Sequence, residues 1–352
     1  MIAFKDGLTI GGDSPIRVNC NIGCNKIEDI QSEISKIEFI QLCNELPDMM
    51  MDLSLIELEE PLYNYIKNNL GLPFGVVLSY HRFTKSKGYQ WEDIRDAFLQ
   101  LCYDGVSFVT IHFTADLDLF SRANQIRKIP VTSRGGGMVL YDSRINNRTQ
   151  NIFRENIDEI ANIALKHNVV ISLGTTFRPG TILDACDSVH IEETLRQLSI
   201  CRLLQSKGVK VMVENIGHIT LDKIATHSKL LSKFNAPIMP LGPLPTDAAI
   251  NEDHIANAIG ATFAAYIRCA HIINCVTRYE HSKSAITQDA IIEAIRAAKV
   301  AAHIADLSRN INKAYLYDAF ITNNRIKEHS CLTDSNNCTR CSTVCPLKLT
   351  SI

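Results

Sequence analysis

Three cysteines near the carboxyl end of the chain have the spacing of metal ligands. Cys338, Cys341 and Cys345 lie in the stretch C-T-R-C-S-T-V-C, which has too little apolar content to bury a core of its own. Three thiolates without a fourth can hold a 4Fe–4S cluster whose fourth iron stays open for S-adenosylmethionine (SAM), as radical SAM chemistry requires. A structural zinc site needs four ligands, for which Cys331 would be the fourth. The spacing favours the cluster and leaves the zinc site and spare thiols open.

A second set of candidate residues follows the apolar runs that have the composition of strands. If those strands run parallel in a barrel, their carboxyl ends meet around one polar cavity, which is where the active sites of such barrels lie. The alternative is that the chain simply becomes polar wherever a strand ends. The residues at these predicted strand ends are Asn21, Asp52, Ser54, Tyr80, His112, Ser133, Arg134, Thr175, Arg178, Glu214, His218, Thr246 and Asp247.

One of these strand ends is rich in glycine. The stretch Ser133-Arg134-Gly135-Gly136-Gly137 is predicted as a loop after the fifth strand. Glycines let backbone N–H groups approach an anion, serine adds a hydroxyl, and arginine adds a bidentate fork, so the stretch could hold a phosphate. Arg178, in T-T-F-R-P-G, would be a second anion contact. A common glycine-rich turn and a surface arginine are the alternatives.

Two histidines lie near carboxylates in the sequence. Glu214 and His218 share the stretch E-N-I-G-H, and His281 follows a long predicted helix in Y-E-H-S. Two imidazoles with water or substrate atoms can hold a divalent metal such as zinc. A single histidine is more often a core or capping residue, so the residue types alone leave the metal site open.

The elements that would position these residues alternate regularly between strands and helices. Eight strands separated by amphipathic helices predict a (β/α)8 barrel of the TIM type, with an open doubly wound sheet as the second choice. Asn168 and Gly208 are predicted helix stops. The predicted strands are 16–22, 49–54, 75–80, 108–113, 130–136, 169–174, 209–215 and 236–242.

We expect residues 1–250 to form the barrel, 251–322 a helical region, and 323–352 a cysteine-rich cluster-binding tail. The helical region would contain two long helices, at 253–276 and 287–308. The first is apolar but includes Arg268 and His271, which favours a buried helix over a membrane span.

The composition excludes several classes of function. The 352 residues carry a net charge of −2 without a basic patch, so we expect no nucleic-acid partner. The amino end lacks a basic segment followed by an apolar one, so we expect no secretory signal. Twelve cysteines without such a signal predict free thiols in a reducing compartment, the cytoplasm.

Ten stretches between Val18 and Leu307 together resemble the phosphomethylpyrimidine synthase family, the radical SAM enzymes of thiamine pyrimidine synthesis. They are VNCNIG, MDLS, VTIHF, TSRGGGM, SLGTTFRPG, VMVENIGH, LGPLPTDAA, DHIANAIGA, CVTRYEH and KVAAHIADL. The resemblance implies a TIM-type barrel and a radical SAM lyase that rearranges aminoimidazole ribotide to the hydroxymethylpyrimidine phosphate. It also implies a 4Fe–4S cluster, SAM, an external electron donor, and a homodimer in which the tail of one subunit covers the barrel of the other.

The resemblance also implies residue roles. Glu214, His112 and Tyr80 would be catalytic, His218 and His281 would hold zinc or another divalent metal, and the three tail cysteines would hold the cluster. The small phosphorylated substrate would be bound by Asn21, Met51, Tyr80, His112, Ser133, Arg134, Gly135, Arg178 and Glu214.

The chain departs from the family pattern in four places. Thr175 begins T-T-F-R-P-G where the family has D-G-L-R-P-G, and Met239 stands for a family tyrosine. The stretch from Glu214 to His218 is E-G-P-G-H in the family, and the tail is C-x2-C-x3-C instead of C-x2-C-x4-C. Loss of a carboxylate and a hydroxyl changes which polar groups of a substrate find partners. The departures suggest a paralogue with another product, such as a 5-hydroxybenzimidazole synthase, or with a related ribotide as substrate. A zinc-dependent barrel hydrolase and a ligand-binding barrel without catalysis are the alternatives from other classes.

Overall fold

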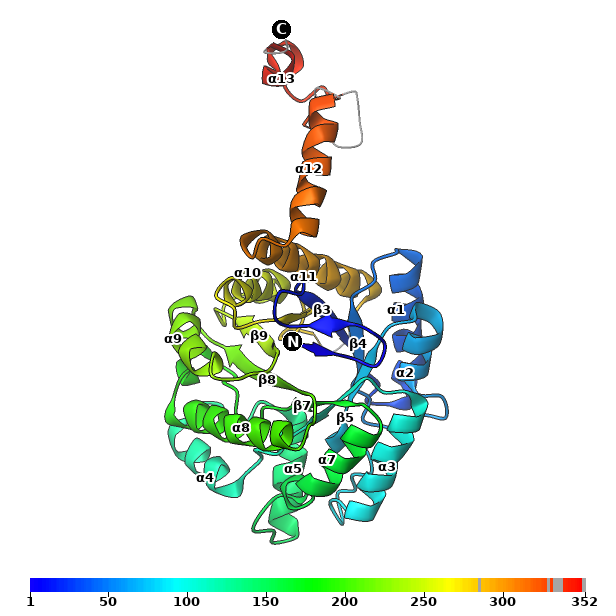
Figure 1. Cartoon of the computed structure of the whole chain (residues 1–352), viewed down its shortest axis with the longest axis vertical. Coiled ribbons are helices and arrows are strands. Elements are labelled where there is room, and N and C mark those ends of the chain that lie inside the picture. Colours follow the sequence, from blue (N-terminus) through cyan, green and yellow to red (C-terminus); the bar gives the residue numbers. More distant parts are fainter. Residues whose placement is uncertain (284–285, 328–329, 332–337, 350–352) are drawn as a thin grey trace. The chain divides into compact units, whose positions relative to one another are not determined.

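The computed structural model describes residues 1–283, 286–327, 330–331 and 338–349 (Figure 1). The chain divides into two units, Met1–Ala305 and Asp306–Ile352, and each is described by itself. The first unit holds the sheet and the helices around it, and the second holds the cysteine-rich tail.

Within the described residues, eight parallel strands form one sheet that curls into a barrel, which confirms the predicted TIM-type fold. Each strand pairs with the next in sequence, except that β10 pairs with β3. The two end strands also meet, because His271 N–H donates to Ile238 O at 2.8 Å and Asn274 Nδ2 donates to Pro240 O at 3.0 Å. The strands are β3 (Arg17–Ile22), β4 (Met49–Asp52), β5 (Phe74–Val77), β6 (Phe108–Ile111), β7 (Val170–Leu173), β8 (Val211–His218), β9 (Ile238–Leu244) and β10 (Ile272–Asn274).

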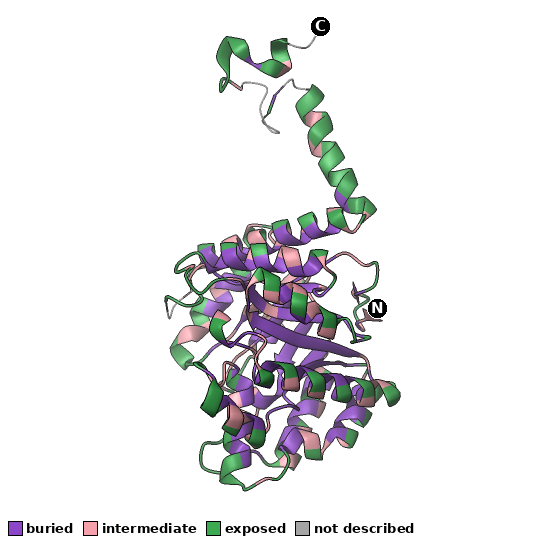
Figure 2. Cartoon of the chain, turned by 90° about the vertical axis from the view of Figure 1, so that its left-hand side faces the viewer, coloured by how far each residue is buried: buried purple, intermediate pink, exposed green. Residues whose placement is uncertain are grey.

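Helices cover the outside of the sheet. Figure 2 shows that the strands are almost wholly buried, whereas the helices around them are buried on one face and exposed on the other. The predicted helix stops are confirmed, since Asn168 and Gly208 have φ of 53° and 84°. The helices are α1 (Ile30–Leu42), α2 (Leu62–Tyr65), α3 (Trp91–Asp104), α4 (Leu117–Ile126), α5 (Arg134–Ile145), α6 (Ile152–Glu155), α7 (Ile157–Lys166), α8 (Ser188–Ser206), α9 (Leu221–Leu231), α10 (Asp253–Tyr266) and α11 (Gln288–Ser308).

The inside of the barrel is filled with apolar side chains toward its amino-terminal end. The short hairpin of β1 (Ile2–Ala3) and β2 (Thr9–Ile10) contributes Phe4, whose ring stacks on Phe108 with centroids 5.4 Å apart. Because Phe108 is the first residue of β6, the hairpin closes the amino-terminal end. The opposite end is left for a cavity. The interior cluster comprises Phe4, Ile10, Met49, Met51, Val77, Phe108, Val170, Met212, Met239 and Ile272.

The predicted strand at 130–136 is wrong. The stretch 131–133 has no regular structure, and α5 begins at Arg134, so the glycine-rich stretch is the first turn of a helix rather than a loop. Ser133 caps this helix, because its Oγ accepts the Gly136 N–H at 3.0 Å. Serine is a preferred cap, and consecutive glycines weaken a strand because they have no side chains to pack.

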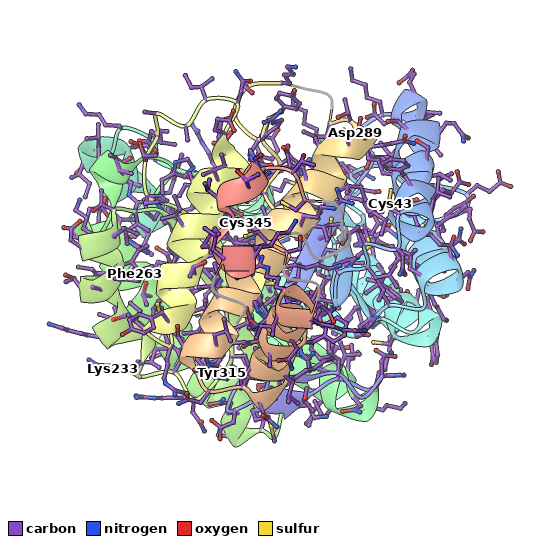
Figure 3. The ribbon with its side chains drawn as sticks, turned by 90° about the horizontal axis from the view of Figure 1, so that it is seen from above. Cys43, Lys233, Phe263, Asp289, Tyr315 and Cys345 are labelled. Atoms are coloured by element: carbon purple, nitrogen blue, oxygen red, sulfur yellow. The ribbon has the colours of Figure 1, made fainter. Side chains whose placement is uncertain are left out.

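The predicted helix over 253–276 is also wrong in its second half. It ends at Tyr266, because Arg268 takes the left-handed conformation with φ of 63°, and β10 follows at Ile272–Asn274. The strand that completes the barrel therefore lies beyond the boundary expected at residue 250. The other predicted long helix, 287–308, is confirmed as α11. Figure 3 labels Phe263 and Asp289, which lie on α10 and α11.

The second unit contains α12 (Asn312–Lys327), a short 3-10 turn at Ser342–Val344, and α13 (Pro346–Leu349). Tyr315, Leu316, Tyr317 and Phe320 on α12 are each more than half exposed.

In the described part of the chain, no helix combines the length and the apolar character that crossing a membrane demands.

Candidate active site

A cavity of about 340 Å³ lies at the carboxyl-terminal end of the barrel. It brings together side chains from all eight strands or the turns that follow them, which is possible only because parallel strands all end on the same side. Ten of the residues predicted from the sequence line it: Asn21, Met51, Tyr80, His112, Ser133, Arg134, Arg178, Glu214, His218 and His281.

Gly135 does not line the cavity but lies directly behind it. A Cβ atom added to Gly135 would lie 2.6 Å from His112 Cε1 and 2.6 Å from Ser79 Oγ. The close approach of the α5 backbone to His112 therefore requires glycine at this position. Gly135 sets the position of the first turn of α5.

His112 and Ser133 form a buried pair. His112 Nε2 lies 2.8 Å from Ser133 Oγ, and both residues are about 5% exposed or less. Burial lowers the pKa of His112 to about 3, with the charge of Arg178 acting in the same direction. The imidazole is therefore neutral at neutral pH and acts through hydrogen bonds rather than charge.

Two guanidinium groups reach the cavity from different elements. Arg134 Nε donates to Tyr80 Oη at 3.3 Å, and its other end donates to Asn25 Oδ1 at 2.8 Å. Arg178 donates to Thr175 O at 3.1 Å, and burial lowers its pKa while Glu214 raises it. Together with the amino end of α5, these two cations make one side of the cavity suitable for an anion.

Glu214 is a buried carboxylate that also lines the cavity. Its Oε1 accepts from Thr110 Oγ1 at 2.6 Å and from Ser172 Oγ at 3.0 Å. Burial raises the pKa of Glu214, and the two hydroxyl donors and Arg178 lower it. Because Oε1 is held by two hydroxyls from neighbouring strands, Oε2 is the oxygen that is left to meet a ligand.

The two predicted metal histidines lie next to each other. The ring centroids of His218 and His281 are 4.9 Å apart at an interplanar angle of 74°. Each Nδ1 is paired with a carboxylate, His218 with Asp247 at 2.7 Å and His281 with Asp253 at 3.0 Å. Carboxylates that hold Nδ1 leave Nε2 as the ligand atom, which is the usual arrangement around metal-binding histidines. The donor set therefore fits a divalent metal.

Sequence reasoning missed several residues of this region. Asn274 and Glu280 line the cavity, and Asp253 holds His281. Asn274 was not predicted as a site residue because the sequence around it was predicted to be helical. In the structure its Oδ1 accepts a hydrogen bond from Asn19 Nδ2 at 2.6 Å inside the barrel. The position of Glu280 beside His281 in the sequence was the signal that could have identified it.

Some predicted strand-end residues face away from the cavity. Asp52 accepts from Ser54 Oγ at 2.6 Å and from the Tyr63 N–H at 3.1 Å, so it organises the turn after β4. Thr175 is fully buried and donates to Glu193 Oε2 at 2.7 Å. Neither Asp52 nor Thr175 offers a polar group to a ligand in the cavity.

All twelve cysteines lie within the described residues and are free thiols. Cys338 is half-buried, Cys341 is exposed and Cys345 is 9% exposed. The 3-10 turn between the last two places the Val344 N–H on Cys341 O at 3.1 Å. Cys331 is also exposed, and residues 332–337 between it and Cys338 lie outside the described residues.

Comparison with known proteins identifies the family. The family model described as "Radical SAM ThiC family" matches residues 4–331. A phosphomethylpyrimidine synthase of Sulfurisphaera tokodaii is 34% identical over 329 residues, which are 90% of this chain and 75% of that protein. The enzyme of the same name from Pyrobaculum aerophilum is 32% identical over 322 residues, with 88% and 74% covered. This chain belongs to the radical SAM ThiC family.

Proposed function

We propose that the chain is a radical SAM lyase that rearranges aminoimidazole ribotide, or a closely related ribotide, in the manner of a thiamine-pyrimidine synthase. One observation carries this proposal. In a chain of the ThiC family, ten residues expected at the substrate and metal sites line one cavity at the end of the barrel. Family membership also favours this activity over the zinc-dependent hydrolase and the non-catalytic barrel.

The phosphate of the ribotide would bind beside α5. Ser133, Arg134 and Arg178 supply a hydroxyl and two guanidinium groups, and Ser133 and Arg134 stand at the amino end of α5. A helix amino end combined with arginine forks is a favourable phosphate site. Met51 and Asn21 line the cavity from β4 and β3, and they would contact the rest of the ribotide.

Glu214 would orient the ribose or the base through its free carboxylate oxygen. Thr110 and Ser172 fix the other oxygen, so the carboxylate cannot rotate away when substrate enters. Tyr80, held by Arg134, and the neutral His112 would complete the catalytic set by donating or accepting hydrogen bonds at the reacting end.

The chain would use two metal centres. Cys338, Cys341 and Cys345 would hold a 4Fe–4S cluster, which supplies one-electron cleavage of SAM when an external donor has reduced it. His218 and His281 would hold zinc or another divalent metal through Nε2, with Asp247 and Asp253 behind them. This second metal would help to place SAM beside the ribotide.

At two positions that depart from the family pattern, Thr175 and Met239, the side chains of this chain do not line the cavity. The hydroxyl of Thr175 donates a hydrogen bond to Glu193. Met239 is fully buried in the interior cluster, together with Met51 and Met212. A substrate that relied on a carboxylate and a phenol there would lose two hydrogen bonds in this chain. This supports a related ribotide or a changed product as part of the proposal.

The test is an anaerobic assay on the full chain after reconstitution with iron and sulfide. We expect about four irons per chain, from the cluster stoichiometry. Reduction with SAM should release 5′-deoxyadenosine and consume aminoimidazole ribotide, and mass spectrometry would identify the product. Colourless protein that binds zinc alone would refute the proposal. Cleavage of SAM without loss of aminoimidazole ribotide would indicate that the enzyme acts on a related ribotide instead.

Cys341→Ala tests whether the tail cysteines hold the cluster. The substitution should abolish SAM cleavage and lower the iron content while the unfolding midpoint of the barrel stays unchanged. A loss of folding instead would indicate a structural site at the tail. Cys201→Ser, at a buried cysteine of α8, should leave the iron content and SAM cleavage as they are in the unaltered chain.

A further inference from the structure

The carboxyl-terminal end of β8 departs from the regular alternation of a strand. Val211 and Val213 belong to the large apolar cluster that the strands share with the helices, whereas Met212 faces the barrel interior. Glu214 then lines the cavity. Ile216 should face the cavity as well, because side chains two residues apart lie on the same face of a strand. Instead, it is fully buried in the cluster shared with the helices.

The backbone of Ile216 explains this change of face. Its φ is 74°, in the left-handed region, which β-branched residues rarely adopt because the Cβ comes too close to the following carbonyl oxygen. The pairing with β9 is irregular at the same place, since Ile216 lies opposite Leu241 but His218 lies opposite Leu244. As a result Gly217, and not the side chain of Ile216, lines the cavity.

The side chain of Asn215 holds this left-handed residue in place. Its Oδ1 accepts the Ile216 N–H at 2.7 Å. The same oxygen lies 3.3 Å from His190 Nε2 and 3.0 Å from His227 Nε2. Because a backbone N–H can only donate, the atom that faces it is the amide oxygen, and both imidazoles donate to that oxygen from Nε2. The Cys186 N–H agrees with this assignment, since it donates to His190 Nδ1 at 3.2 Å.

The other end of the Asn215 amide is fixed as well. Its Nδ2 donates to Gln197 Oε1 at 2.8 Å and to Thr194 Oγ1 at 3.2 Å, and both of these residues lie on α8. Gln197 Nε2 in turn donates to the backbone carbonyl oxygen of Glu214 at 2.8 Å. Asn215, Gln197 and Thr194 are fully buried, so the amide cannot turn without leaving buried polar groups unpaired.

The left-handed turn also sets the position of a predicted metal ligand. The next residue, Gly217, has φ of 101°, and a Cβ atom added to it would lie 2.5 Å from Pro179 O. The His218 N–H donates to the same carbonyl oxygen at 2.9 Å. Pro179 directly follows Arg178 in the chain. A shift of the turn would therefore move His218 relative to the proposed anion-binding arginine.

We propose that Asn215 is a positioning residue that holds Ile216 in the left-handed conformation, which keeps the isoleucine side chain out of the cavity and fixes His218 for metal binding. The inference rests on the proposed function, in which His218 is a metal ligand. The resembled E-G-P-G-H motif has glycine and proline where this chain has Asn215 and Ile216. Proline is confined to φ of about −65° and has no N–H to donate. The arrangement therefore belongs to this chain rather than to the motif.

The experiment removes the acceptor of the Ile216 N–H by Asn215→Ala in the full chain after iron–sulfur reconstitution. Zinc retained per chain in zinc-buffered solution is measured by elemental analysis, with His218→Ala as the baseline. We expect zinc binding to weaken by about tenfold or more. A double variant that also carries Ile216→Gly should bind zinc as the unaltered chain does, because glycine adopts a positive φ readily and has no side chain to enter the cavity. Its unfolding midpoint should stay below that of the unaltered chain, since a buried side chain is lost.

Thr194→Val is the matched control for a purely structural role of the network. It removes one partner of Asn215 Nδ2 and leaves the hydrogen bond between Oδ1 and the Ile216 N–H intact. It should lower the unfolding midpoint and keep the zinc binding of the unaltered chain. The proposal is overturned if Asn215→Ala binds zinc as the unaltered chain does, if Thr194→Val loses as much zinc, or if the loss persists with Ile216→Gly.

Amide hydrogen exchange tests the turn without zinc, ribotide or SAM. The Ile216 amide should be protected in the unaltered chain and should exchange about fivefold faster or more in Asn215→Ala. Rapid exchange of this amide in the unaltered chain overturns the proposal even if no variant folds. If the unaltered chain binds no zinc that His218→Ala loses, the second metal of the proposed function is refuted instead, and the exchange rates alone decide the role of Asn215.

Discussion

The two buried titratable groups of the cavity respond to burial in opposite ways. Glu214 loses solvation as an anion, so burial raises its pKa, while the hydroxyls of Thr110 and Ser172 and the charge of Arg178 lower it. His112 would lose solvation as a cation, so burial lowers its pKa to about 3. Of the two, only Glu214 has neighbouring groups that favour its charged form, and His112 contributes through its hydrogen bond to Ser133.

We expect Glu214→Gln to reduce ribotide consumption by about a hundredfold or more, because the amide lacks the charge and the basicity of the carboxylate. The glutamine Oε1 can still accept from Thr110 and Ser172, so the fold should persist. Ribotide loss and the unfolding midpoint would be measured on the same preparation. Wild-type consumption by the variant would exclude Glu214 from catalysis.

Burial of His112 makes the stability of the chain depend on pH. The unfolded chain binds a proton near pH 6.5, whereas the folded chain binds it only at about 3. Between these values the unfolded state holds the extra proton, so stability falls as pH falls, by up to about 1.4 kcal/mol per pH unit for one histidine. Urea unfolding at about pH 7 and about pH 5 should show a smaller loss in His112→Asn. Equal losses in the two proteins would contradict this account.

At the scale of elements, the first turn of α5 joins the fold to the proposed phosphate site. Ser133 caps the helix, Gly135 lies against His112, and Arg134 extends toward Tyr80. A small displacement of this turn would move the hydroxyl, the guanidinium and the N–H groups together. The phosphate contacts therefore depend on how closely α5 approaches β6.

Gly135→Ala should raise the KM for the phosphorylated substrate. The new Cβ would lie 2.6 Å from His112 Cε1, so the helix turn must shift. Gly137→Ala is the matched control, because its Cβ would meet nothing within 4 Å among the described atoms. Alanine in a helix is favoured over glycine by about 0.5–1 kcal/mol, so the control should keep its KM and gain some stability. If the KM rose in both variants, the effect would not be specific to the contact between Gly135 and His112.

At the scale of the whole molecule, the chain has a barrel unit and a tail unit. The barrel carries the cavity, and the tail carries the cysteines that would hold the cluster. The exposed Tyr315, Leu316, Tyr317 and Phe320 on α12 support association with another copy, since apolar side chains gathered on a surface mark interaction sites. We propose a homodimer in which each tail serves the barrel of its partner.

Mixing two inactive variants tests this arrangement. Cys341→Ala removes a cluster ligand from the tail, and Glu214→Gln alters the barrel. If tails serve the partner's barrel and subunits exchange at random, half of the dimers contain one intact site, which gives about a quarter of wild-type activity. Activity would be measured as ribotide loss after exchange, with each variant alone as the control. If mass spectrometry shows mixed dimers but ribotide loss does not recover, the proposed exchange of tails between subunits is refuted.

The sequence by itself determined the barrel and most of its cavity. Seven of the eight strands were predicted, because alternating apolar runs and amphipathic helices follow from local periodicity. Parallel strands must end on one side, so residues such as Asn21, His112 and Glu214 could be expected together before any contact was known. The spacing of the three tail cysteines is also a local feature, so it too could be read from the sequence alone.

Only the tertiary structure decided the features that depend on contacts between distant residues. β10 has three residues and continues an apolar stretch, so only its pairing with β3 distinguishes it from a helix. The glycine-rich stretch is the first turn of helix α5 because Ser133 caps it and because Gly135, which has no Cβ, can pack directly against His112. The pairing of His281 with Asp253, and of His190 and His227 with one amide oxygen of Asn215, joins residues with no fixed spacing. Such contacts form when the barrel closes, because closure brings separate helices and strands within hydrogen-bond distance.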